Sequence, residues 1–296
     1  MLEFLKYKKV YFIFSGLLIL GSVVCLFVFG LNLGIDFTGG SILEITYLNE
    51  RPTNEEIKGA LSELDLGTIY LQPTGDKGVI IRMKDITEET HQEIIRQLSQ
   101  NQAMEEQRFE SIGPTIGQEL KQKTIILIMV ALFSIVLYIA FAFRKVQRPI
   151  PSWQYGLASL IALFHDVLIP LGIFSILGKF YGVQITIPVI AGLLTVLGYS
   201  INNTVVVFDR IRENLIKRVG ITFEETVNKS LNQTLTRCLN TSLTTLLVLL
   251  AIFFFGGSTL EYFALVLIIG IVAGTYSSLF LASPLLVSWL AWWGRT

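Results

Sequence analysis

Residues 192–214 read GLLTVLGYSINNTVVVFDRIREN, and the interpretation of the whole chain starts from this stretch. Its first half is apolar and belongs to a run long enough to cross the hydrocarbon core of a bilayer. In a helix, polar residues spaced three to four positions apart share one broad face, and here they are Thr195, Tyr199, Asn202 and Asn203. Polar side chains in a membrane are costly unless they face other helices or water. We therefore expect this face to look inward, either as plain helix contact or as part of a pathway.

The composition of the whole chain predicts an α-helical integral membrane protein. Of its 296 residues, 52% are hydrophobic, more than in an ordinary soluble protein of this size. Six apolar runs are long enough to span a bilayer as helices, near 11–30, 124–143, 155–177, 185–208, 238–255 and 263–283. The first run is longer than the apolar core of a signal peptide, so we expect it to remain as an anchor.

Lysine and arginine are distributed unevenly between the two sides of the predicted spans. They cluster before the first span, between the second and third, and between the fourth and fifth, whereas the other loops carry few. The positive-inside rule then places both termini in the cytoplasm and residues 32–123 outside it. The charged end of the opening stretch becomes a cytoplasmic motif, formed by Asp209, Arg210, Arg212 and Glu213.

A small domain is predicted outside the membrane. Strand-like alternation at 41–48, 68–72, 79–83 and 107–112 is interleaved with two helical segments, the first opened by the capping box Thr53-x-x-Glu56. The order is βαββαβ, the ferredoxin-like α+β arrangement. His91 lies alone on the second, polar helix, where we expect it to be solvated. The chain thus divides into 1–31 with the first span, 32–114 outside the cytoplasm, and 115–296 as a five-helix membrane bundle with cytoplasmic loops.

One acidic residue lies deep inside a predicted span. Asp166 falls near the centre of the third span beside His165, and an ionisable group at that depth is by default a functional hypothesis. Asp166 could carry a proton, pair with a buried cation or hold a neighbouring backbone. The residues by themselves leave all three interpretations open.

A basic residue stands where the fifth span begins. Arg237 is followed on the same helical face by Asn240, Thr241 and Thr244. A polar face on a membrane helix favours contact with another helix. The simpler alternative for Arg237 is snorkelling to the cytoplasmic interface.

Four motifs together resemble a known family. GIDFTGG at 34–40 follows the first span, HDV at 165–167 lies in the third, GYSINNTVVVFDRIREN at 198–214 closes the fourth, and LNQTLTR at 231–237 opens the fifth. With one span, an outer βαββαβ domain and five further spans, the chain resembles the SecF family of protein-export membrane proteins, a half-module of the RND superfamily. The resemblance covers nearly the whole sequence.

The resemblance implies a location and a set of partners. The location would be the plasma (inner) membrane of a bacterium, in contact with membrane lipid, and the partner would be SecD. The resemblance further implies docking to the SecYEG translocon and use of the proton motive force to finish movement of an unfolded preprotein. The outer domain would hold or pull the emerging preprotein.

The resemblance also implies which residues couple ion movement to transport, and here the chain departs from the family. Coupling is attributed there to an aspartate in the fourth span and an arginine on the fifth. The arginine matches Arg237, but Asn203 stands at the aspartate position. An amide has no proton to exchange at physiological pH, although its carbonyl oxygen can bind a small cation. Either a SecD aspartate carries coupling with Asp166 assisting, or sodium is the ion with Asn203 as a ligand, or the chain is an uncoupled scaffold.

Other functions are less well supported by the residues. An RND-type small-molecule or lipid transporter is the alternative, but six spans and one small outer domain leave little room for a substrate pocket without a partner. An intramembrane hydrolase built on His165 and Asp166 lacks a second aspartate and the His-Glu-x-x-His pattern, so we expect no enzyme activity. Cys25 and Cys238 predict two free thiols, so we expect no metal site and no cofactor. The short basic loops sit where topology needs them, so we expect no nucleic-acid binding.

Overall fold

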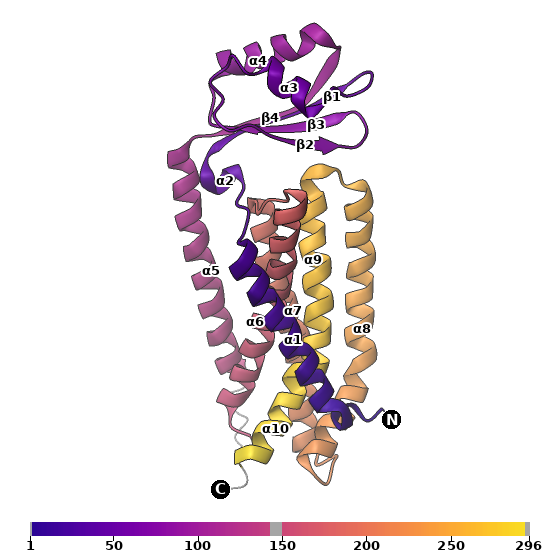
Figure 1. The fold of residues 1–296 in the computed structure, drawn as a ribbon. Helices are drawn as coiled ribbons and strands as arrows, with labels where there is room; N and C mark the ends of the chain where they lie inside the picture. Colours follow the sequence, from indigo (N-terminus) through magenta and orange to yellow (C-terminus); the bar gives the residue numbers. More distant parts are fainter. Residues whose placement is uncertain (1, 143–149, 294–296) are drawn as a thin grey trace. The chain divides into compact units, whose positions relative to one another are not determined.

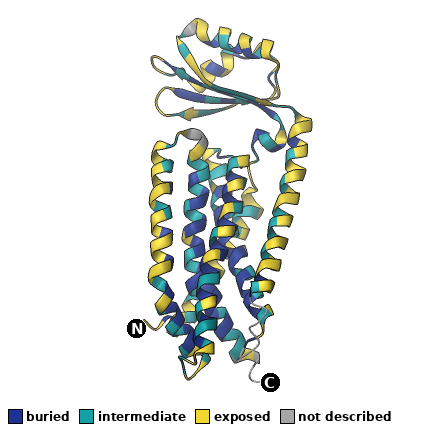
Figure 2. Cartoon of the chain, turned by 180° about the vertical axis from the view of Figure 1, so that it is seen from behind, coloured by how far each residue is buried: buried dark blue, intermediate teal, exposed yellow. Residues whose placement is uncertain are grey.

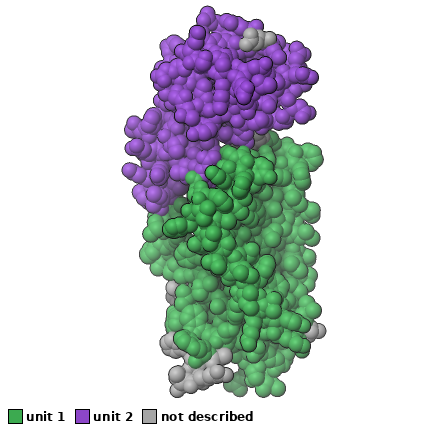
Figure 3. All heavy atoms as spheres, viewed as in Figure 1, with its two compact units in different colours: residues 1–31, 127–183, 187–296 green, residues 32–126, 184–186 purple. Residues whose placement is uncertain are grey.

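A computed structural model of the chain describes residues 2–142 and 150–293 (Figure 1). The chain forms two compact units, shown in different colours in Figure 3. The membrane unit contains residues 1–31, 127–183 and 187–296. The outer unit contains residues 32–126 and 184–186. We describe each unit by itself.

Six helical segments of the described chain are long and apolar enough to cross a membrane, as the sequence predicts. They are α1 (Lys8–Phe29), preceded by the short η1 (Phe4–Tyr7), then α5 (Pro114–Ala142), α6 (Ser152–Tyr181), α7 (Ile187–Ile216), α8 (Phe223–Phe255) and α9 (Ser258–Ser277). The sixth segment continues from α9 through a π-helical turn, η2 (Ser278–Ala282), into α10 (Ser283–Trp293). Pro170 lies inside α6 without ending it.

The centre of the membrane unit is built from α6, α7 and α9. In α6 and α7, half of the residues in the most apolar stretch are buried, and in the α9 segment two thirds are (Figure 2). In α1, α5 and α8 few residues of the corresponding stretch are buried. Large side chains fill the core between the central helices, among them Tyr155 and Phe208, whose rings meet edge to face 5.3 Å apart. The outer helices therefore present apolar surface that lipid can cover.

Small residues let the central helices approach each other closely. A Cβ atom added at Gly192 of α7 would lie 2.4 Å from Val266 Cγ1 of α9, and one added at Gly270 of α9 would lie 2.2 Å from Val196 Cγ2 of α7. Both distances are far below an ordinary carbon–carbon contact. Close packing through small residues is the usual way in which membrane helices associate, and it fixes the register of α7 against α9.

The N-terminal segment is held against the start of α8. Asn228 Oδ1 accepts a hydrogen bond from the Phe4 amide at 2.9 Å, and Asn232 Oδ1 accepts one from the Leu2 amide at 2.9 Å. The Nδ2 groups of Asn228 and Asn232 both donate to the Leu2 carbonyl, at 3.0 Å and 2.9 Å. Lys8 also pairs with Glu224 at 3.1 Å. These contacts satisfy main-chain groups that precede the first span.

The outer unit has the predicted βαββαβ order, preceded by the short α2 (Ile35–Thr38). Its elements are β1 (Gly40–Tyr47), α3 (Asn54–Ala60), β2 (Tyr70–Thr74), β3 (Gly78–Met83), α4 (Glu88–Asn101) and β4 (Met104–Ile112). The strands form one sheet in the order β2-β3-β1-β4, and every neighbouring pair is antiparallel. This is the split arrangement of a ferredoxin-like fold, with β3 inserted between β2 and β1.

Helices α3 and α4 cover one face of this sheet. Alternate residues of β1, such as Leu43 and Ile45, are fully buried together with Ile57 of α3 and Ile94 of α4. The predicted capping box is present, because the Thr53 side chain accepts from the Glu56 amide while the Glu56 side chain accepts from the Thr53 amide. The local sequence signals therefore set both the start of α3 and the face that it buries.

The prediction that His91 is solvated is wrong. The side chain is buried, and its ring stacks on that of Phe109 of β4 with centroids 3.8 Å apart. Its Nδ1 atom lies 3.1 Å from Glu88 Oε1, and its Nε2 atom lies 3.3 Å from Glu106 Oε2. His91 precedes Ile94 and Leu98 by three and seven residues, so it lies on the buried face of α4.

Candidate functional site

Asp166 lies at the centre of the membrane unit and is fully buried. Its Oδ1 atom is 2.8 Å from Nδ1 of His165, the preceding residue on α6. Its Oδ2 atom accepts hydrogen bonds from the hydroxyls of Ser200 of α7 and Ser277 of α9, the latter at 2.7 Å. Three helices thus meet on one carboxylate, and its partners are side chains rather than backbone groups.

His165 is buried as completely as Asp166. While its Nδ1 atom faces the carboxylate, its Nε2 atom has no hydrogen-bond partner among the described residues. The ring lies over that of Tyr276 of α9 with centroids 5.9 Å apart. The Tyr276 hydroxyl accepts from the Ser15 hydroxyl at 3.2 Å and donates to the Tyr11 carbonyl at 3.2 Å, both on α1. The imidazole therefore faces the packing between α9 and α1.

A change of helix type occurs beside this acid. The π-helical turn η2 begins at Ser278, directly after Ser277. Ser278 shares a hydrogen bond of 3.1 Å with Thr204 of α7 and donates to the Gly274 carbonyl at 2.6 Å. Single π-helical turns inside longer helices occur frequently at functional sites. Here the turn brings two consecutive serines of one segment to face α6 and α7.

Asn203 is buried one turn beyond Ser200 on α7. Its Nδ2 group donates to the Ser242 hydroxyl of α8 at 3.4 Å, and Ser242 shares a hydrogen bond of 2.6 Å with Thr275 of α9. Asn203 is therefore part of a polar contact between α7, α8 and α9. An amide carbonyl oxygen such as that of Asn203 is of a type that can bind a small cation.

In this chain by itself, only part of the polar face of α7 is buried. Thr195 and Asn202 are exposed, Tyr199 is half-buried against Thr245 of α8, and only Asn203 is fully enclosed. The reason is helical geometry, since Asn202 and Asn203 point about 100° apart. On α8 the neighbouring flank is also exposed and polar. We call the exposed set the polar stripe; it consists of Thr195, Asn202, Arg237, Asn240, Thr241 and Thr244.

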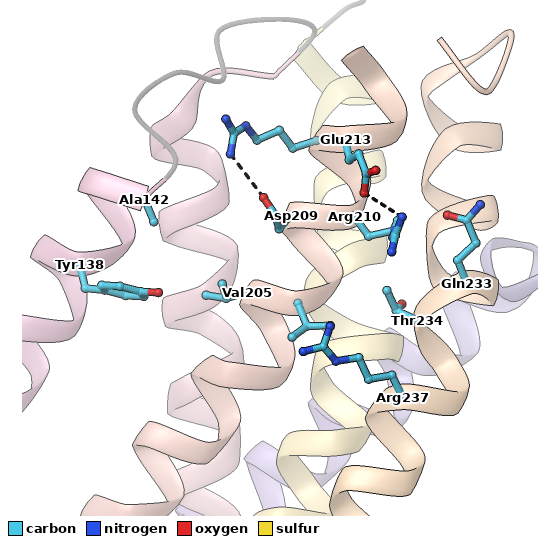
Figure 4. A pocket seen from close by; sticks show the side chains of 11 residues that line it. Tyr138, Ala142, Val205, Asp209, Arg210, Glu213, Gln233, Thr234 and Arg237 are labelled. Atoms are coloured by element: carbon cyan, nitrogen blue, oxygen red, sulfur yellow. Dashed lines mark hydrogen bonds and ion pairs between the residues drawn. The ribbon is translucent and has the colours of Figure 1, made fainter. Parts of the chain in front are cut away.

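A cleft of about 420 Å³ lies at one end of this flank, between α5, α7 and α8 (Figure 4). The cleft is lined by Asp209, Arg210, Arg212 and Glu213 of the predicted motif, together with Gln233, Thr234 and Arg237. The four motif residues pair among themselves, Arg210 with Glu213 at 2.7 Å and Arg212 with Asp209 at 3.3 Å.

Arg237 takes no part in this pairing. Within residues 2–142 and 150–293 no ion pair involves its guanidinium, which points into the cleft (Figure 4). The structure thus brings Arg237 to the motif of α7 but not to Asp166, whose hydrogen bonds within the described chain are to His165, Ser200 and Ser277.

Comparison with known protein families gives two matches. The sequence model described as "Protein export membrane protein SecD/SecF, C-terminal" matches residues 91–292, and that described as "SecD/SecF GG Motif" matches residues 26–47. The chain belongs to the SecD/SecF family of protein-export membrane proteins. The GG motif corresponds to Gly39 and Gly40, both with positive φ, where an added Cβ at Gly39 would lie 2.8 Å from Pro114 Cα.

Relatives within the SecD/SecF family match almost end to end. The protein translocase subunit SecF of Thermobaculum terrenum is 43% identical over 98% of this chain and 94% of its own length. The SecF subunit of Rhodothermus marinus is 42% identical over 96% of this chain and 92% of its own length. The crystal structure of SecDF from Thermus thermophilus, a translocon-associated membrane protein, superposes with a TM-score of 0.85 at 35% identity. It covers 98% of this chain, which spans only 39% of that longer SecDF chain.

Sequence reasoning missed several residues of the buried polar site around Asp166 and Asn203. Ser277 and Ser278 are interpretable from sequence only as small residues suited to helix packing, and Ser242 carries no signal of its own. Ser200 lies inside the most informative stretch, but a serine in a membrane helix is common. What makes these residues functional candidates is their position around Asp166 and Asn203, which depends on the register between helices.

Proposed function

We propose that this SecF-like chain works with a SecD partner in protein translocation and drives late steps of preprotein export with an ion-motive force. The chain is SecF-like over nearly its full length, and it is a multi-pass membrane protein. The orientation we propose has both ends in the cytoplasm and the outer unit on the far side of the plasma membrane of a bacterium. The distribution of lysine and arginine between the loops supports that orientation.

The main observation that supports a partner chain is the polar stripe. An exposed arginine, two amides and three threonine hydroxyls on membrane helices are costly in contact with lipid tails. The threonine hydroxyls are partly satisfied within their own helices, since Thr241 donates to the Arg237 carbonyl and Thr244 to that of Asn240, each at 2.9 Å. Asn202, Arg237 and Asn240 are better satisfied by a second membrane chain. The larger size of the SecDF chain fits a second half supplied separately here.

We propose that Arg237 of the polar stripe and the buried Asn203 take part in coupling transport to an ion gradient. Arg237 provides a fixed positive charge at the cleft, and Asn203 provides a buried amide that cannot exchange a proton. An acid on SecD facing Arg237, or Asp166 in this chain, then supplies the protonatable group. One elementary charge moving down 100 mV releases about 2.3 kcal/mol, enough to bias a conformational change of a few kcal/mol.

The SecYEG translocon and an unfolded preprotein complete the proposed assembly. The outer unit, a four-stranded sheet with helices on one face, would hold the preprotein as it emerges. Its fold by itself does not specify a substrate. The assignment rests on the family and on the proposed placement of this unit outside the cytoplasm.

The experiment is preprotein import into inverted membrane vesicles that contain this chain with its own SecD. A proton gradient alone and a sodium gradient alone are imposed in parallel. Stimulation of import by the proton gradient alone would indicate that a carboxylate or imidazole carries the coupling proton. Stimulation of import by the sodium gradient alone would indicate that Asn203 is a ligand of the coupling ion. No stimulation by either gradient would refute ion coupling in this chain; restoration by Asn203→Asp would then mark it as an uncoupled form.

Partner binding is tested separately by co-purification with SecD. The variants Arg237→Ala and Asn240→Leu remove charge and amide from the polar stripe. The control is Leu243→Ala, because Leu243 is also exposed on α8 but is apolar and points about 120° away from Arg237 around the helix. We expect the stripe variants to lose SecD while Leu243→Ala retains it. Equal retention by all three variants would contradict the proposed interface.

A further inference from the structure

The pair formed by His165 and Asp166 has one unsatisfied position. Ser200 and Ser277 donate to Asp166 Oδ2, and His165 Nδ1 lies 2.8 Å from Asp166 Oδ1, so both carboxylate oxygens are engaged. His165 uses Nδ1 toward the carboxylate, while Nε2 is buried without a partner in the described part of the chain. Buried polar atoms are nearly always hydrogen-bonded, so a persistent exception requires a functional or structural reason.

The net charge of the His165–Asp166 pair depends on whether Nε2 carries a proton. A neutral imidazole beside an ionised carboxylate leaves one net negative charge deep in the membrane unit, which is unfavourable at that depth. A proton added to the Nε2 lone pair makes the pair neutral overall. The deprotonated pair is nonetheless tolerable, because three hydrogen-bond donors surround the carboxylate. The pair therefore has two accessible states that differ by one proton.

The surroundings contain no charge that would fix one state. Residues 10–29 of α1, 187–208 of α7 and 262–293 of the α9 segment carry no lysine, arginine, aspartate or glutamate, and neither does α6 between 152 and 178 apart from Asp166. The titratable groups facing the pair are phenols, Tyr276 of α9 and, behind it, Tyr11 of α1. From α7 the Ser200 hydroxyl donates a hydrogen bond to the pair.

We propose that His165 Nε2 is the atom that takes up and releases the coupling proton in this chain, with Asp166 as the counter-charge that makes this possible. On uptake the Nε2 lone pair forms an N–H bond with a proton drawn from water on the outer side, and the pair changes from one negative charge to none. On release that bond breaks and the proton passes to water on the cytoplasmic side. This inference rests on the proposed function, because it assumes that protons drive the assembly.

The geometry also connects the pair to the region that meets SecD in the proposed assembly. Loss of the proton strengthens the hydrogen bonds that Ser200 and Ser277 donate to Asp166, because the carboxylate then carries an uncompensated charge. Ser200 lies one turn from Asn203 on the helix that carries Thr195 and Asn202 of the polar stripe. Ser277 directly precedes the π-helical turn. The proton state of the pair thus acts on the packing of α6, α7 and α9.

Nitrogen NMR of the full chain in lipid nanodiscs tests the proton site directly. The chain has two histidines, so ¹⁵N-histidine labelling gives two sets of ring signals, and His91→Asn assigns them. As the pH is varied, we expect the His165 Nε2 signal to move between its protonated and unprotonated positions, because the proposed proton carrier occupies both states. Asp166→Asn should displace this transition, because it removes the counter-charge. A His165 Nε2 signal that stays in one state throughout, or that ignores Asp166→Asn, would overturn the proposal.

Preprotein import into vesicles containing SecD tests the link to coupling. His165→Asn keeps an N–H donor near Asp166 but cannot take up a proton, and His91→Asn is the matched control in the outer unit. We expect His165→Asn to bind SecD and to retain ATP-driven import, but to lose the increment produced by a proton gradient. An unchanged increment in His165→Asn overturns this inference and leaves the proposed function intact. Absence of any increment in the wild-type complex refutes the proposed ion coupling itself, and stimulation by sodium alone overturns the proton assignment.

Discussion

Replacing Gly192 with alanine should destabilise the membrane unit through one identifiable contact. The added Cβ would lie 2.4 Å from Val266 Cγ1 on α9, about 1.1 Å closer than an ordinary carbon–carbon contact of ~3.5 Å. Val266 is fully buried, so its methyl group has no open space to move into. Forcing an extra methyl group into a packed core typically costs about 1–3 kcal/mol.

Gly198 is the matched control on the same helix, because an added Cβ there meets nothing within 4 Å. Both substitutions gain up to about 1 kcal/mol in helix propensity, so that gain cancels in the comparison. We therefore expect Gly192→Ala to be about 1–3 kcal/mol less stable than Gly198→Ala. The measurement is loss of helical circular dichroism as the denaturing detergent fraction increases. Val266→Ala removes the overlapping methyl group, so the double variant should recover part of the loss, with a coupling of about 0.5–3 kcal/mol. Equal stability of the two alanine variants, or strict additivity with Val266→Ala, would refute the packing argument.

Four further predictions concern local contacts. Thr53→Ala should lower the thermal stability of the outer unit by about 0.5–2 kcal/mol, because it removes the cap of α3. Hydrogen bonds from the Thr53 amide and hydroxyl hold the pKa of Glu56 below its usual 4.5. A carboxyl group whose pKa is lowered in the folded state stabilises the fold above its unfolded pKa, and that stabilisation is lost as the pH falls through its folded pKa. Glu56→Gln should therefore flatten the acid limb of a plot of stability against pH. Ser175→Ala removes the hydroxyl that donates to the Cys25 and Gly30 carbonyls at 2.9 and 2.6 Å, and should cost about 1 kcal/mol in the detergent titration. Asn228→Ala with Asn232→Ala should speed hydrogen exchange at the Leu2 and Phe4 amides, and unchanged exchange would show that the segment is held otherwise.

The fold of this chain is largely predictable from local sequence signals. Apolar length predicts the six spans, and alternation together with the Thr53 and Glu56 pair predicts the outer βαββαβ domain. These features depend on periods within one segment, which the sequence displays directly. His91 shows how such a signal can be misinterpreted. Its spacing to Ile94 and Leu98 indicates the buried face of α4, but its polarity favoured a solvated position.

The buried site is predictable only in part. The sequence identifies Asp166 because an acid in an apolar span is rare. It does not identify Ser200 and Ser277 as the donors to that acid, since this requires the register of α7 and α9 against α6. That register is set by close approaches such as those at Gly192 and Gly270, which depend on three-dimensional packing. Likewise, whether a polar residue faces inward or outward depends on how many helices surround it, and Asn202 is exposed for that reason.

The attachment of the outer unit has a mechanical consequence. The chain enters the sheet at Gly40 of β1 and leaves it at Ile112 of β4, and these two residues are paired in the antiparallel ladder. A force that separates the two attachment points would therefore open the ladder one hydrogen bond at a time from its end, which is the weakest direction for a β-sheet to bear load. A force that moves both points together leaves every bond of the ladder unloaded. The sheet is thus suited to be displaced as one rigid body and unsuited to be stretched between Gly40 and Ile112.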